Sequence, residues 1–138
     1  MASQSVAYLL GLFFSVNLMP GMVWGHGEDQ PGPHGGHIRM PGAFHTELVT
    51  KSKTELNVFL LDMDWANPMT EGSSVKVIFK LGKKESPLKC ETKQDHFRCK
   101  APQGISIVPP GKVEITAIRN GATGGLAVYE LLLKNRKQ

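Results

Sequence analysis

The sequence predicts an all-β fold, an immunoglobulin-like or cupredoxin-like β-sandwich of about seven strands. Three observations support this class. From residue 43 onward, short segments alternate apolar and polar residues with a period of two. Turn-forming stretches rich in glycine, proline and asparagine, such as "ANPMTEGS" and "NGATGG", separate these segments. No segment of ten or more residues has a convincing helical periodicity, and a chain of 138 residues is the size of one domain.

The alternation defines the individual strands. In the first, Thr46 and Leu48 fall on one face, and His45 and Glu47 fall on the other. The second is a more continuous apolar run, which is typical of a strand covered on both faces. The last has helical propensity as well, but the hairpin signal "NGATGG" before it favours a strand. The expected strands are residues 43–51, 55–63, 74–82, 89–93, 96–100, 111–119 and 126–135.

Residues 1–25 have the layout of a secretory signal peptide. They contain no charged side chain, residues 6–18 are mostly apolar, and Val23 and Gly25 occupy the −3 and −1 positions of a cleavage site. An uncleaved membrane anchor is the alternative, but the apolar run is shorter than the roughly 20 residues that a spanning helix needs. We therefore expect cleavage after Gly25, a mature chain that begins at His26, and a periplasmic or secreted protein with no stable membrane insertion.

The two cysteines, Cys90 and Cys99, lie in two short expected strands that meet at a turn. An even number of cysteines in an exported chain predicts a disulfide. Directly opposed residues of a hairpin also lie close enough to be bridged. The alternative is a metal site made of two thiols with His96 between them. We expect the disulfide, because thiols normally pair in an oxidising compartment.

Charge and motifs argue against two functional classes. The formal net charge is +4, but the lysines are scattered without interleaved aromatic residues, so we expect no nucleic-acid partner. The sequence has no nucleophile elbow, phosphate-binding glycine loop or HExxH motif, so we do not expect an enzyme. Asp62 and Asp64 alternate onto one face and could bind a hard cation or act in acid–base chemistry. The simpler interpretation is that they hydrogen-bond the backbone of the following Asn-Pro turn.

Four of the five histidines lie within a short N-terminal stretch. His26 would be the first residue after cleavage, so its α-amine and ring could chelate one metal ion. His34 and His37 are separated by two glycines that would let their rings converge, and His45 follows on the first expected strand. Nitrogen donors of this kind suit copper(II) and zinc. The alternative is a flexible, solvated tail that binds divalent metals only incidentally.

Three methionines are candidates for further metal ligands. Met40, Met63 and Met69 offer thioethers that suit copper(I). Methionine more often fills irregular gaps in a core, and we expect this above all of Met63 because it ends an apolar strand.

The stretch "HGEDQPGPHGGHIRMPGAFHTEL", followed by "LNVFLLDMDWANP", resembles known exported proteins over residues 26–68. It is similar to small exported bacterial proteins with an HGEDxPGPHGG leader. It also looks like the N-terminal β-domain of periplasmic adaptor subunits of heavy-metal efflux pumps, where an HGG motif leads into a strand. The resemblance implies a periplasmic β-sandwich that handles copper or another heavy metal, with His34 and His37 as the best-matched ligands and His26 next.

This chain has none of the coiled-coil or barrel regions of an adaptor, so the resemblance implies a metal carrier or an accessory module of an efflux system. The expected layout is a signal peptide (residues 1–25), a Gly/Pro/His-rich leader (26–36) and a β-sandwich domain (37–138). The expected function is transition-metal binding, copper first and zinc second. The alternative is a non-catalytic protein-interaction module whose strand edge or Trp65 loop is the working surface. The expected metal ligands are His26, His34, His37 and His45.

Overall fold

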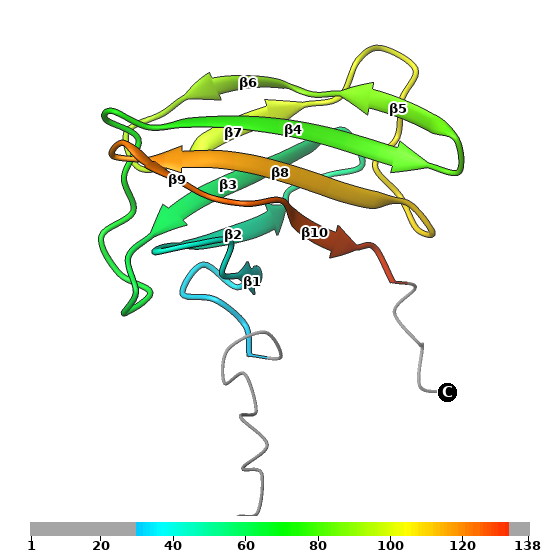
Figure 1. The fold of residues 1–138 in the computed structure, drawn as a ribbon. Helices are drawn as coiled ribbons and strands as arrows, with labels where there is room; N and C mark the ends of the chain where they lie inside the picture. The colour runs from blue at the N-terminus through cyan, green and yellow to red at the C-terminus, as the bar shows by residue number, and fades with distance from the viewer. Residues whose placement is uncertain (1–29, 133–138) are drawn as a thin grey trace, which may run out of the picture.

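A computed structural model describes residues 30–132, which form two antiparallel sheets packed as a β-sandwich and contain no helix (Figure 1). The predicted all-β class is confirmed. The expected signal peptide and His26 lie outside the described residues. Sheet A has, in spatial order, β1 (His37–Arg39), β2 (His45–Thr50), β3 (Glu55–Leu61), β7 (Phe97–Lys100) and β6 (Lys89–Thr92). Sheet B has β10 (Ala127–Glu130), β8 (Lys112–Arg119), β4 (Ser74–Leu81) and β5 (Lys84–Pro87), with β9 (Ala122–Thr123) paired to β8.

Each of the seven expected segments contains a strand, and the structure adds three short ones: β1, β5 and β9. β5 and β9 fall within "GKKESP" and "NGATGG", which were interpreted as turns. Both are only two to four residues long and each forms by pairing with a longer neighbour, β4 or β8. Such pairing leaves little periodicity in the sequence, which is why these strands were missed. The last expected segment contains strand β10, so the strand interpretation is confirmed there.

The main core lies between the sheets and is built from the apolar faces predicted by alternation. One polar pair crosses it. The Tyr129 hydroxyl donates a hydrogen bond to the Thr46 carbonyl oxygen at 2.9 Å, and the Thr46 hydroxyl lies 2.5 Å from the same phenolic oxygen. These contacts connect β10 of sheet B to β2 of sheet A and provide partners for buried polar groups. Buried members of this core include Phe44, Leu48, Leu56, Leu60, Val77, Phe79, Phe97, Val113 and Ile115.

The two sheets are connected on both sides. On one side the chain passes from β5 to β6 through Leu88, whose N–H donates to the Val77 carbonyl at 2.9 Å. Figure 1 shows β5 and β6 end to end along this side. On the other side, Arg39 of β1 donates through Nε to the carbonyl oxygen of Val128 in β10 at 3.0 Å. The same guanidinium lies 5.1 Å from the centroid of the Tyr129 ring.

A second, smaller apolar cluster lies on the outer face of sheet A, away from sheet B. It contains Ile38, Phe59 and Leu61, with Val49 and Trp65 packed against it. β3 is therefore buried on both faces, as its continuous apolar run predicts. A sheet face of this kind needs a cover, and the residues that precede β1 provide one.

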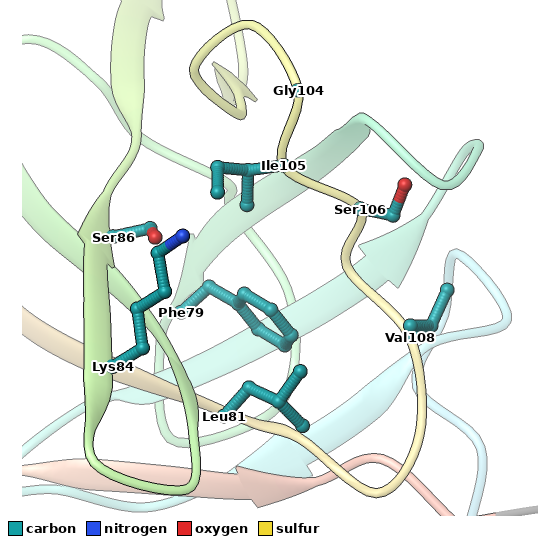
Figure 2. Close-up of a pocket in the computed structure, with 8 residues that line it drawn as sticks. All are labelled: Phe79, Leu81, Lys84, Ser86, Gly104, Ile105, Ser106 and Val108. Atoms are coloured by element: carbon teal, nitrogen blue, oxygen red, sulfur yellow. The ribbon is translucent and has the colours of Figure 1, made fainter.

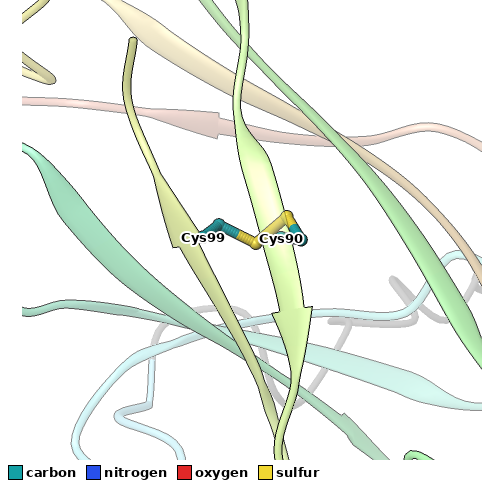
Figure 3. Close-up of a disulfide and its surroundings, with 2 residues drawn as sticks. All are labelled: Cys90 and Cys99. Carbon is teal, nitrogen blue, oxygen red and sulfur yellow. A yellow bond between two sulfur atoms is a disulfide. The ribbon is translucent and has the colours of Figure 1, made fainter. Parts of the chain in front are cut away.

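Cys90 and Cys99 form a disulfide between β6 and β7 (Figure 3). They are directly opposed in the strand register, with 4.0 Å between their Cα atoms. This confirms the predicted bridge, and it excludes a metal site made of two free thiols at this position. A disulfide is compatible with an oxidising compartment outside the cytoplasm. Residues 30–132 contain no apolar helix long enough to cross a membrane.

The disulfide should contribute measurably to stability. It closes a loop with a sequence separation of 9. By its effect on the entropy of the unfolded chain, a loop of this length is worth about 2–3 kcal/mol. The double variant Cys90→Ala/Cys99→Ala should lose this amount in the free energy of unfolding, measured with urea. Reductant should destabilise the wild type and leave the double variant unchanged. Equal stability of the wild type with and without reductant would contradict the prediction.

Candidate functional site

Residues 31–36, "PGPHGG", form a tight turn that folds back onto sheet A. Pro31 makes an isolated bridge to His37, and the N–H of Gly32 donates to the Gly36 carbonyl at 2.9 Å. Gly35 has φ +78°, a left-handed conformation that glycine adopts without strain. Residues 31–36 are therefore not the solvated tail that the sequence offers as an alternative. The turn is ordered by its own hydrogen bonds and by the sheet beneath it.

The turn is held against sheet A by hydrogen bonds to Glu47 of β2, whose side chain is fully buried. Its Oε1 accepts hydrogen bonds from the backbone N–H groups of His34 (2.8 Å) and Gly36 (3.0 Å). Its Oε2 lies 2.7 Å from Nδ1 of the His34 ring. A buried carboxylate is costly unless it is hydrogen-bonded, and these three contacts satisfy both oxygens.

The glycines of the turn are needed for this approach. A Cβ added to Gly32 would collide with the Glu47 carboxylate, and one added to Gly36 would collide with the backbone carbonyl of Leu48. The "HGG" motif and the glutamate of "HTEL" are thus one structural unit, although Glu47 lies 13 positions after His34 in the chain. Sequence reasoning did not find Glu47. A signal for it was available. Glu47 alternates onto one face of β2, beside β3, and the continuous apolar run of β3 predicts that both faces of the sheet are covered there.

The ring of His34 is held in one place on the outer face of sheet A. It stacks on Phe59 with 3.7 Å between ring centroids and 6° between planes. Its side chain keeps 32% of its surface exposed. Stacking and two hydrogen bonds to Glu47 leave the imidazole fixed yet open to solvent along part of its surface. Among the expected metal ligands that lie within residues 30–132 (His34, His37 and His45), His34 is the one that the structure both immobilises and leaves accessible.

His37 does not share this position. It lies on the edge strand β1, is exposed, and is paired with Leu48, whereas its neighbour Ile38 is paired with Glu47. Alternation therefore places His37 on the opposite face of sheet A from Ile38 and Glu47. The two glycines between His34 and His37 do not bring the two rings onto one face. Within residues 30–132, no three His, Cys, Asp or Glu side chains are grouped closely enough to hold a metal ion.

His45 is buried, with 8% of its surface exposed, and belongs to a different contact group. Its Nδ1 lies 3.0 Å from the Asp62 carbonyl oxygen, which can only accept, so Nδ1 carries the proton. Its ring also meets Trp65 edge-on, at 5.9 Å and 71°. These contacts tie His45 to the turn that follows β3 and account for its position as an ordinary strand residue.

His96 contributes to the outer face of sheet A in a way that the sequence did not predict. Its place between the two cysteines favours a position at the tip of their hairpin, but its ring lies 5.1 Å from that of Phe59. The register explains this contact: Val58 pairs with Phe97, so the next residue of β3 and the preceding residue of the β7 hairpin lie side by side. The Nδ1 atom of His96 lies 2.6 Å from Oδ1 of Asp95.

Asp62 organises the turn after β3. Its Oδ1 accepts from the N–H groups of Asp64 and Ala66, each at 2.9 Å, and its Oδ2 accepts from the Asn67 side chain at 2.7 Å. The hydrogen bonds from Ala66 and then Asn67 are the main reasons that the pKa of Asp62 lies below its usual value. The predicted turn role of this carboxylate is confirmed.

Two of the three methionines do not behave as predicted. Met63 and Met40 are 52% and 56% exposed, so the expectation that they fill the core is wrong for both. β3 ends at Leu61, and the Asp62 turn then leads the chain away from the core before Met63 is reached.

A hollow of about 260 Å³ lies on the other sheet, between the β4–β5 hairpin and the loop around residues 104–108 (Figure 2). Its lining is mostly apolar, with one ammonium group and two hydroxyl groups, and it includes no histidine, carboxylate or thiol. Within this lining no imidazole, carboxylate or thiolate is present to bind a metal ion. The lining residues are Phe79, Leu81, Lys84, Ser86, Gly104, Ile105, Ser106 and Val108.

Comparison with protein-family models, with curated proteins and with solved structures finds no match to this chain.

Close packing of the turn against β2 can be tested at Gly36. We expect Gly36→Ala to lower the free energy of unfolding by about 1–3 kcal/mol, because the added methyl group overpacks the contact with Leu48. Hydrogen exchange of the His34 amide should also become faster. Gly42→Ala is the matched control, since a Cβ there would meet its nearest atom, the Thr123 carbonyl oxygen, at an ordinary 3.4 Å. Equal stability of the two variants would show that the turn is not packed as described.

The Asp62 turn should make stability depend on pH. Because its pKa is lowered in the folded protein, Asp62 stabilises the fold fully above the pKa of the unfolded chain, about 3.9. That contribution is lost as the pH falls through the lower, folded-state pKa. Urea unfolding at a series of pH values should therefore show a smaller acid-induced loss for Asp62→Asn than for the wild type. Asp64→Asn should retain the wild-type profile, since the Asp64 carboxylate accepts none of these hydrogen bonds. A wild-type profile for Asp62→Asn would refute the assignment.

Proposed function

We propose that this chain is an exported, periplasmic protein that binds a transition metal, copper first and zinc second, with His34 as its anchored ligand. The observation that carries the proposal is the state of the His34 ring. It is stacked on Phe59, hydrogen-bonded through Nδ1 to a buried carboxylate, and partly exposed. Histidines that bind metals very commonly have their second nitrogen bonded to a carboxylate or carbonyl in this way.

The remaining donors do not form a preformed cage around His34. His37 is exposed three residues further on, and His26, with its α-amine if cleavage follows Gly25, precedes the described residues. We propose that these two groups complete the coordination after local rearrangement. His45 stays in the proposal as a fourth donor, but its burial against Trp65 makes it the most costly to recruit.

Export and a role in metal handling are parts of the same proposal, and each has its own support. The Cys90–Cys99 disulfide is the feature that supports an oxidising compartment. The resemblance of the leader to heavy-metal efflux adaptors supports a periplasmic efflux component as a partner. We propose a carrier or accessory module rather than an enzyme, with the metal ion as its cargo.

The second candidate is a protein-interaction module whose histidines are structural. One observation favours it. The Gly125 N–H donates to the Pro41 carbonyl at 2.8 Å, and the chain neighbours of these two residues, Met40 and Leu126, are each 56% exposed. Exposed apolar pairs of this kind are typical of contact surfaces, although a single pair is small.

Metal affinity of the full exported protein separates the two candidates. Titration with copper(II) and zinc, in competition with a chelator, should show tight binding by the wild type. His34→Ala/His37→Ala should bind at least tenfold more weakly, because even outer partners of ligating histidines cost roughly 10–100-fold when removed. His96→Ala is the control, since it removes an imidazole from the same face without removing a proposed ligand. Wild-type affinity in the double variant would reject the site and favour the interaction module.

A further inference from the structure

We infer that the buried carboxylate of Glu47 determines which nitrogen of His34 is able to bind a metal ion. The inference rests on the proposed function, and it assigns Glu47 a positioning role in addition to its structural one. A neutral imidazole carries its proton on one nitrogen and a lone pair on the other, and only the lone pair binds metal. The partner of one nitrogen therefore decides the chemistry of the other.

The geometry leaves one arrangement for the neutral ring. Oε2 of Glu47 lies 2.7 Å from Nδ1, and an ionised carboxylate can only accept hydrogen bonds. The proton therefore resides on Nδ1, and the lone pair resides on Nε2. Among residues 30–132, no group makes a hydrogen bond to Nε2 of His34. The ligating atom is then Nε2, on the edge of the ring away from Glu47.

The surroundings keep this arrangement fixed. Glu47 has no exposed surface, so water does not compete for its oxygens. Its other oxygen is held by the N–H groups of His34 and Gly36, which prevents the carboxylate from turning away. The flat stack on Phe59 fixes the plane of the imidazole. Backbone, carboxylate and ring thus form one rigid unit in which a single nitrogen is presented.

A second carboxylate–histidine pair on the same face provides an internal comparison. Asp95 and His96 are neighbours in the chain, and the Asp95 side chain is 50% exposed, in contrast to the fully buried Glu47. Solvent can replace that hydrogen bond, so Asp95 exerts much weaker control over its partner. Both pairs involve histidines that contact Phe59, which makes Asp95 a matched control for Glu47.

The decisive variant is Glu47→Gln. The amide oxygen can still accept from the two backbone N–H groups, but the amide NH₂ now faces Nδ1 and can only donate. His34 must then place its proton on Nε2, where it blocks the proposed ligand atom. Long-range ¹H–¹⁵N spectra of the metal-free protein at pH 8, where an ordinary imidazole is neutral, should show Nδ1–H in the wild type and Nε2–H in the variant. Affinity for copper(II) and for zinc should fall roughly 10–100-fold.

Asp95→Asn should change neither the His34 spectrum nor the metal affinity. An Nε2–H signal in the wild type overturns the inference, and this measurement does not depend on whether the variant folds. Wild-type affinity in a folded Glu47→Gln protein overturns it as well. A wild type that takes up neither metal instead overturns the proposed function, and the metal-free spectra still decide whether Glu47 sets the tautomer.

Discussion

The N-terminal part of this fold depends on one buried carboxylate. Glu47 lies in β2, between β1 and β3 of sheet A, on the face that does not meet sheet B, where a charged group would normally be exposed to water. Leaving a buried polar group without partners costs about 1–3 kcal/mol, and more when it is charged. The turn at residues 32–36 meets this requirement by directing two backbone N–H groups and one imidazole at the carboxylate. The turn and the glutamate therefore require each other.

This constraint gives sheet A two covered faces. Its inner face forms the main core with sheet B, and its outer face carries Ile38, Phe59 and Leu61 beneath the turn. The turn has few apolar side chains of its own to bury, so hydrophobic burial alone would not hold it down. Hydrogen bonds to Glu47 and the stack of His34 on Phe59 supply the attachment instead. The polar and the apolar contacts act on the same few residues, which explains how so glycine-rich a segment becomes part of the fold.

The sequence was informative where structure follows from neighbours along the chain. Period-two alternation gave the inner faces of the long strands, and cysteine spacing gave the bridge across one hairpin. The turn role of Asp62 also depends only on residues up to Asn67. Contacts between distant segments were not predictable in this way. His96 meets Phe59 only through the register of β3 with β7, and the short strands β5 and β9 exist only because longer partners template them. Met63 was misjudged because its strand ends two residues earlier.

The glycines of "HGG" show the same limit of sequence-based prediction at the candidate site. In the sequence they suggested flexibility that would let His34 and His37 converge on one ion. In the structure they serve close packing: Gly36 is pressed against the backbone of β2, and Gly35 completes the turn with a positive φ. The consequence is the opposite of convergence, because His34 is fixed over one face while His37 continues into the edge strand. In the proposed site a fixed imidazole would lose little entropy on binding an ion, which makes His34 the proposed first point of attachment. The separation of the other donors makes any complete site depend on groups that come to His34, rather than on movement of His34 itself.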